Sequence, residues 1–185
     1  MAKQDLVVPV DESGHPLPDT DGQPRTMDKL QAHQEGTLHL AVSVFIFNSN
    51  HELMLQKRAA DKYHTPDRWT NTCCTHPFPG EPPAETAQRR LKEEMGLSVP
   101  LTEAFTFHYC ADVGELVEHE YDHVFIGFSD DGPTPDAAEV SDWKWIGQDE
   151  LDIEVVERPE TVTPWLGLVY AKAFQMAAKA NPTQA

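Results

Sequence analysis

The sequence has few cysteines and no long hydrophobic run. Among its 185 residues there are three cysteines, and an odd count with two of them adjacent, Cys73 and Cys74, argues against a disulfide framework. Reduced thiols are typical of the cytoplasm, so we expect a cytoplasmic protein. No apolar stretch approaches the roughly 20 residues that cross a membrane, and the first residues do not resemble a secretory signal. We therefore expect no membrane partner.

Basic residues are also scarce. Fourteen Lys and Arg stand against 31 Asp and Glu, which gives a formal net charge of −17. Such a field repels nucleic acid and anionic membranes, so we expect neither as a partner. An anionic small molecule is repelled too, unless the few basic residues and bound cations converge on one place. Length and composition are those of one globular domain, which we expect to be a monomer.

The hydrophobic pattern predicts an α/β (α+β) domain, with mixed strands and helices packed on them. One helix is expected over residues 80–97, where prolines suit the first turn and Gly96 suits a left-handed stop. Its apolar stripe would be Ala84, Ala87, Leu91 and Met95. A second helix is expected over residues 163–180, with Thr163 as its cap and Pro164 at its first position. Strands are expected at 6–10, 38–48, 53–58, 104–113 and 116–129, and a strand and turn at 141–151.

The segment RRLKEEMGL, from Arg89 to Leu97, resembles the Nudix motif, a loop–helix unit whose glutamates hold Mg²⁺ on a diphosphate. Two residues depart from it: Thr75 stands at the first glycine, and Arg90 replaces a metal-binding glutamate of the hydrolases. A guanidinium weakens metal assembly and offers a fork for a diphosphate. The site is therefore predicted to hold a diphosphate rather than cleave it. An amphipathic surface helix with incidental charges is the alternative for this segment.

Histidines and glutamates suggest a second cation site. Glu118 and Glu120 are two residues apart in an expected strand, so their side chains share a face. Together with three histidines they would make a five- or six-coordinate site suited to Mn²⁺, Mg²⁺ or Zn²⁺. The candidate ligands are His33, His39, His76, Glu118 and Glu120.

These features together resemble type I isopentenyl diphosphate isomerase, a Nudix-fold family of isoprenoid biosynthesis. The run W-T-N-x-x-C-x-H-P, Trp69 to Pro77, is highly specific for that family, and the resemblance reaches from about Lys29 to Trp165. It implies a Nudix-type isomerase domain at 29–180, after a strand and loop extension at 1–28 and before a tail at 181–185. The other matching motifs are KLQAH, LHLAVSVFIFN, KRAADK, RRLKEEMG, VEHEYDHVF and VTPW.

The resemblance implies a role for each matching residue. Cys74 and Glu120 would transfer protons, Tyr109 would hydrogen-bond near Glu120, and Trp165 would cover the reacting carbons. Glu94 would hold a Mg²⁺ that bridges to the substrate diphosphate, in addition to the cation of the His/Glu set. Some members have one more residue between the first two histidines than His33 and His39 have here, and this shorter spacing would move His33 by one residue's reach. The residues implied to contact the diphosphate are Lys29, Arg58, Lys62 and Arg90.

The implied reaction moves a double bond in a small homoallylic or allylic diphosphate. Isopentenyl diphosphate gains a proton at its terminal methylene and loses one at C2, through a carbocation-like state, to give dimethylallyl diphosphate. Cys74 is expected to favour its thiolate beside His76 and the metal, and which group acts as acid stays open. Cys73 and Cys110 are interpreted as packing residues. The alternatives are a Nudix diphosphate hydrolase and a non-catalytic metal-binding module.

Overall fold

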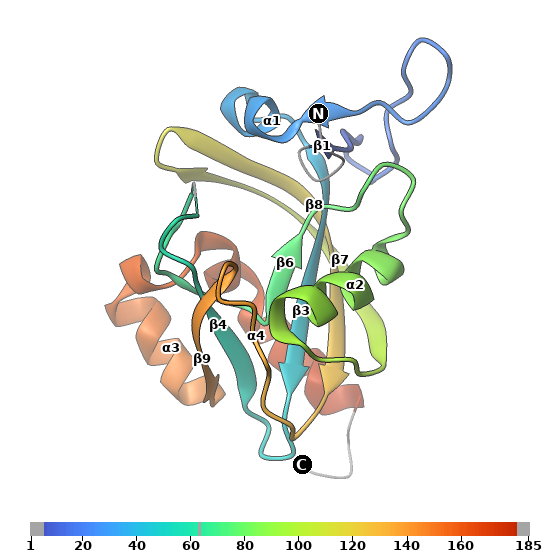
Figure 1. Cartoon of the computed structure of the whole chain (residues 1–185). Coiled ribbons are helices and arrows are strands. Elements are labelled where there is room, and N and C mark those ends of the chain that lie inside the picture. The colour runs from blue at the N-terminus through green and yellow to red at the C-terminus, as the bar shows by residue number, and fades with distance from the viewer. Residues whose placement is uncertain (1–5, 63, 181–185) are drawn as a thin grey trace.

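The computed structural model describes residues 6–62 and 64–180, so the expected tail at 181–185 lies outside the described residues. A seven-stranded mixed sheet forms its centre, and a two-stranded sheet lies beside it (Figure 1). The large sheet contains β3 (His39–Phe47), β4 (Leu53–Arg58), β5 (Trp69–Thr70), β6 (Cys73–Thr75), β7 (Leu101–Val113), β8 (Leu116–Phe128) and β9 (Val140–Ile146). The small sheet contains β1 (Leu6–Val7) and β2 (Met27–Asp28).

The strands diverge toward one end of the large sheet. β3 and β4 form a hairpin that pairs only at Phe47 and Leu53. Beyond that point β3 pairs with β6, whereas β4 pairs with β5 and β9. β3 also runs parallel to β8, with His39 opposite Glu120. The divergence therefore brings the start of β3, the start of β8 and the end of β4 to the same open end.

Helices cover both faces of this sheet (Figure 1). The helix α2 (Pro83–Met95) packs on one face, whereas α3 (Gln148–Glu157) and α4 (Pro164–Ala180) pack on the other. The short helix α1 (Lys29–Glu35) lies at the open end. None of the helices in the described ranges is both long and apolar enough to span a membrane.

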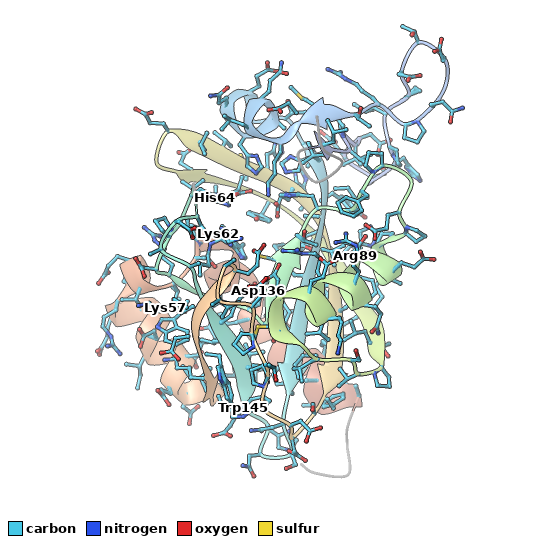
Figure 2. The ribbon with its side chains drawn as sticks, in the orientation of Figure 1. Lys57, Lys62, His64, Arg89, Asp136 and Trp145 are labelled. Carbon is cyan, nitrogen blue, oxygen red and sulfur yellow. The ribbon has the colours of Figure 1, made fainter. Side chains whose placement is uncertain are left out.

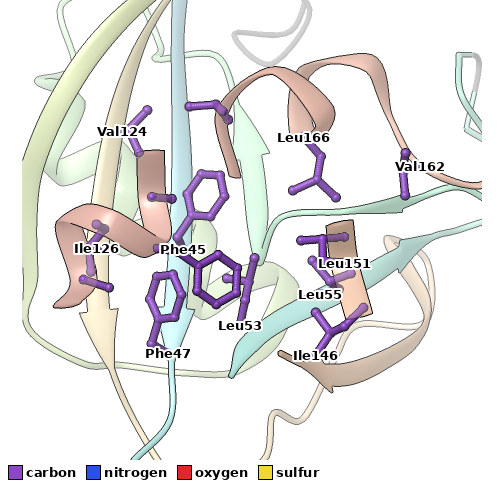
Figure 3. Close-up of a cluster of buried hydrophobic side chains, with 14 residues drawn as sticks. Phe45, Phe47, Leu53, Leu55, Val124, Ile126, Ile146, Leu151, Val162 and Leu166 are labelled. Carbon is purple, nitrogen blue, oxygen red and sulfur yellow. The ribbon is translucent and has the colours of Figure 1, made fainter. Parts of the chain in front are cut away.

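The alternating side chains of β3 divide the core into two layers. Val42, Val44 and Ile46 face α2 and pack with its Leu91 and Met95. Phe45 and Phe47 face the opposite way, into a cluster that includes Leu151 of α3 and Leu166 of α4 (Figure 3). β3 is thus buried on both faces, as its nearly continuous run of apolar residues, interrupted at Ser43, predicts.

The fold confirms most of the expected elements. Gly96 ends α2 with a φ of 69°, and Leu97 packs back into the core beneath the helix. Pro164 begins α4 as expected. The hairpin of β7 and β8 turns at Gly114, whose φ is 75°. Glycine tolerates the positive φ at Gly96 and Gly114, and proline fixes the φ of a first helical residue at Pro164, which is why the sequence predicts these boundaries well.

Three expectations are wrong, and the short strands β5 and β6 of the segment Trp69–Pro77 are not among the predicted elements. The expected turn near residue 151 is instead α3, whose apolar stripe is weak because most of its side chains stay in solvent. Ala84 is exposed rather than part of the buried stripe of α2. Cys110 is exposed rather than packed, because it lies on the outer face of β7.

Candidate active site

Five potential metal ligands gather at the open end of the sheet. β3 and β8 bring His39 next to Glu120, and the alternation of β8 turns Glu118 to the same side. α1 carries His33 to this point, and His76 follows directly after β6. One donor atom from each residue lies within 4.8 Å of the others. The sequence places these residues up to 87 positions apart, so the fold alone brings them together.

Backbone carbonyls orient two of these imidazoles. The Nδ1–H groups of His33 and His39 donate to the carbonyls of Lys29 and Thr37, at 2.5 and 2.7 Å. Each Nε2 therefore points inward. There the Nε2 atom of His33 lies 3.0 Å from a Glu118 oxygen, and that of His39 lies 3.1 Å from the Nε2 atom of His76. Metal-binding histidines usually have such an outer hydrogen bond, so the set fits a divalent cation.

The charges of this cluster also fit a cation. Burial, reinforced by the nearby Glu118, raises the pKa of Glu120 to about 7. Burial lowers the pKa of His39 to about 3, so its ring is neutral near neutral pH. Neutral imidazoles and carboxylates are the forms that bind metals. A bound cation would offset the repulsion between the two buried carboxylates.

The predicted proton-transfer residues line one cavity of about 140 Å³. Cys74 reaches it from β6, and Glu120 reaches it from β8. The hydroxyl of Tyr109 donates to Glu120 at 2.7 Å. The indole N–H of Trp165 donates to the Thr70 hydroxyl at 2.9 Å, which fixes the ring in the cavity wall. A thiol, a carboxylate and an aromatic face therefore meet around one small space.

The expected thiolate at Cys74 is not favoured by its protein surroundings. Burial raises the pKa of the Cys74 thiol to about 12, although the nearby Arg58 opposes this shift. The expectation rested on the neighbouring histidine, but the pKa of His76 is itself well below its usual value, because burial disfavours its charge. The side chains alone therefore keep the thiol protonated at neutral pH.

Four predicted diphosphate-binding cations line the same cavity, although the protein is strongly acidic. Arg58 is fixed by the carbonyls of His64 and Thr65, each at 3.2 Å. Its guanidinium lies 5.6 Å from the centre of the Trp165 ring. The convergence is what an anionic substrate requires of a chain with net charge −17. The cations are Lys29, Arg58, Lys62 and Arg90.

Glu94 is buried beside Arg90 at one side of this cavity. The residue is 4% exposed, and its carboxylate accepts a hydrogen bond of 2.9 Å from the Gln56 amide and pairs with Arg90. Arg90 also contacts Glu93 at 2.9 Å. A guanidinium thus occupies part of the acidic face of α2, which leaves fewer free carboxylates there for metals.

Sequence reasoning missed His64, Glu139 and Asp122. His64 lies 2.7 Å from a Glu118 oxygen, and Figure 2 shows it with Lys62 on the loop after β4. Glu139 lies in the cavity wall and pairs with Lys62 and Arg90. Asp122 is buried and accepts a hydrogen bond of 2.6 Å from Ser43. Only Asp122 had a signal, because it continues the alternation of Glu118 and Glu120 along β8.

Comparison with known proteins places this site in a family. Residues 37–166 match the NUDIX domain. The chain is 47% identical over 164 residues to "Isopentenyl-diphosphate Delta-isomerase 2" of Aromatoleum aromaticum, covering 88% of this chain and 83% of that protein. It is 43% identical to "Isopentenyl-diphosphate Delta-isomerase" of Pectobacterium atrosepticum, covering 90% and 89%. The chain belongs to the isopentenyl-diphosphate Δ-isomerase family within the Nudix superfamily.

Solved structures agree on the fold of this isomerase family member. The protein DR0079 from Deinococcus radiodurans superposes with a TM-score of 0.69 at 15% identity, covering 85% of this chain and 96% of that one. At such low identity the likeness shows the Nudix fold alone. The expected family and fold class are confirmed, whereas the division at residues 28 and 180 stays a prediction.

Proposed function

We propose that the chain interconverts isopentenyl diphosphate and dimethylallyl diphosphate at this cavity. The observation that carries the proposal is the single cavity that combines a thiol, Cys74, a carboxylate, Glu120, and four converging cations. The cations suit the diphosphate, and the two acid–base groups suit the hydrocarbon end. The relatives named as isopentenyl-diphosphate Delta-isomerases support the same reaction.

The reaction requires one proton donor and one proton acceptor. A proton is added to the terminal methylene carbon, the double bond supplies the electrons, and a second proton leaves C2 to form the new double bond. Glu120 and Cys74 are the two groups positioned for this exchange. Trp165 would present its π face to the cationic state, an interaction of about 2 kcal/mol when desolvated. Water has to be kept from the cavity during this step, because it would otherwise capture the cation.

The metal roles belong to the same proposal. The three histidines with Glu118 and Glu120 would hold one divalent cation, Mn²⁺, Mg²⁺ or Zn²⁺, which supplies positive charge beside the reacting carboxylate. Glu94 would hold a Mg²⁺ that supplies positive charge for the diphosphate. Glu94→Gln is then expected to weaken substrate binding clearly and to change the melting temperature little. A large drop in melting temperature would instead favour a structural role for Glu94.

Proton NMR of isopentenyl diphosphate in D₂O tests the reaction. The expected result is dimethylallyl diphosphate that carries deuterium from the solvent. A Nudix hydrolase would instead release phosphate or nucleotide from nucleoside diphosphates with Mg²⁺. Rapid release in that assay, or metal uptake without any turnover of isopentenyl diphosphate, would overturn the isomerase assignment.

A further inference from the structure

Two buried polar side chains lie beside the active-site cavity without reaching it. Thr70 and Asn71 are both 0% exposed, although each carries polar groups that are costly to remove from water. Neither is among the described residues that line the cavity. Thr70 ends β5, and Asn71 lies between β5 and β6, the strand that carries Cys74. Any effect of this pair on the reaction must therefore pass through the residues that it contacts.

The hydrogen bonds of Asn71 fix the direction in which Thr70 donates. The Asn71 amide nitrogen donates to the carbonyl oxygen of Cys73 at 2.7 Å and to a second carbonyl, in β3, at 3.2 Å. Because carbonyls only accept, the amide oxygen of Asn71 faces Thr70 and accepts from its hydroxyl at 3.0 Å. The lone pairs of that hydroxyl accept from the Trp165 indole N–H at 2.9 Å and from the Thr163 hydroxyl at 3.0 Å. Thr70 therefore uses its full hydrogen-bonding capacity.

This chain of hydrogen bonds joins two parts of the cavity wall. At one end is the indole of Trp165, which α4 carries into the wall. At the other end is the carbonyl of Cys73, which belongs to the peptide bond that precedes Cys74. A buried polar network that is fully satisfied makes the structure around it rigid and specific. The chain thus fixes the aromatic ring relative to the strand that carries the thiol.

We propose that Thr70 and Asn71 are positioning residues that hold the Trp165 ring in place relative to the Cys74 thiol. The inference rests on the proposed isomerase function, in which the ring faces the carbocation-like state. A displaced ring would stabilise that state less, whereas the four cations of the cavity would still bind the diphosphate. The expected signature is therefore a lower kcat for isopentenyl diphosphate at an unchanged KM.

Thr70→Val tests the role of the hydroxyl, because valine has a similar volume but cannot accept from the indole. We expect kcat to fall by about 10- to 30-fold as the cation–π contact is weakened. Thr70→Ser keeps a hydroxyl and should restore most of the activity. Thr72→Val is the matched control, since Thr72 is also 0% exposed but its hydroxyl bonds to backbone groups of Ile46 and Met54. It should lower the melting temperature and leave kcat near that of the wild type.

The indole N–H of Trp165 gives a readout that needs no turnover. Its signal in a ¹H–¹⁵N spectrum is assigned by its loss in Trp165→Phe. Thr70→Val should move this signal upfield, because the proton loses its acceptor, whereas Thr70→Ser and Thr72→Val should leave it near its wild-type position. A wild-type chain that does not convert isopentenyl diphosphate would overturn the proposed function, and the indole signal would still test the contact on which the positioning role depends.

Asn71→Ala tests the other end of the chain. It should also lower kcat at an unchanged KM, and combining it with Thr70→Val should cost no more than the more impaired single variant, because both act through one network. Should Asn71→Ala fail to fold, the Thr70 variants decide the proposal alone. A wild-type kcat or a wild-type indole signal in Thr70→Val would overturn it, as would a loss in Thr70→Ser equal to that in Thr70→Val.

Discussion

At the scale of single residues, adjacent cysteines in β6 have opposite environments. Cys73 points toward α2 and is 1% exposed within the apolar core, whereas Cys74 points into the cavity. The alternation of the strand assigns the two thiols to different faces, although the sequence presents them as equals. Strand geometry thus ranks them independently of any family resemblance.

Substitution of these neighbours gives a matched pair of variants. Cys74→Ala is expected to lower kcat for the isomerisation by at least about 100-fold, since a positioned proton-transfer group contributes that much or more. Cys73→Ala should keep most of the activity, because it removes only a small buried group. Deuterium incorporation into isopentenyl diphosphate measures both. An equal loss in the two variants would contradict the assignment of the thiol.

Glu139 is expected to compete with the substrate for two cations. Its carboxylate pairs with Lys62 and lies 3.4 Å from Arg90, and both cations line the cavity. Glu139→Gln should therefore lower the KM for isopentenyl diphosphate by about three- to fivefold, as expected for a partly exposed ion pair worth up to ~1 kcal/mol. kcat should stay near that of the wild type.

Glu85→Gln provides the control for Glu139, because Glu85 lies at an exposed position in the first turn of α2 and is not part of the cavity lining. This variant also removes one negative charge, but from a side chain outside the cavity wall. KM should therefore change little. A rise in KM for Glu139→Gln would show instead that this carboxylate positions Lys62 for the diphosphate.

At the scale of elements, predictability followed the strength of local signals. β3 and β4 have dense β-branched and apolar patterns, and α2 ends at Gly96, so their existence was clear from the sequence. α1 and α3 were missed because each is short and most of its side chains face solvent. The convergence of Glu139 with Lys62 could not be predicted, because it depends on pairing between β4 and β9, which are distant in sequence.

The stability that the loop before α2 contributes to the fold is expected to depend on pH through Glu81. Arg89 donates to both Glu81 oxygens at 2.7 Å, and this hydrogen bonding lowers the pKa of Glu81 to about 2, from 4.5. Because the folded pKa is the lower one, the stabilisation is complete above about pH 4.5 and is lost as the pH falls through about 2. Solvent screening reduces it to about 1 kcal/mol.

Urea unfolding of Glu81→Gln measures this contribution. The variant should be less stable than the wild type by about 1 kcal/mol at neutral pH, and the difference should shrink as the pH falls toward 2. Glu85→Gln, at an exposed position in the first turn of the same helix, is the control and should show no such convergence. A difference that is constant with pH would contradict a charged pair.

At the scale of the whole molecule, basic residues gather at one cavity although the chain is strongly acidic. The chain carries 14 basic residues, and four of them line one cavity of about 140 Å³. The net charge of −17 repels anions at long range, so a diphosphate needs the local attraction that these converging cations and bound metals supply. Local convergence, rather than net charge, therefore governs which ligand the molecule accepts.

The cation of the active-site cluster is expected to stabilise the whole fold. Its proposed ligands come from α1, β3, β8 and the segment after β6, so the ion would join elements distant in sequence. A ligand at 100 times its Kd adds about 2.7 kcal/mol, so dialysis against a chelator should lower Tm by about 5–10 °C. His76→Ala should shrink this shift, whereas His123→Ala should keep it, because His123 lies on the outer face of β8 and pairs with Glu103. An unchanged Tm after chelation would show that the fold around the five ligands is equally stable without the ion.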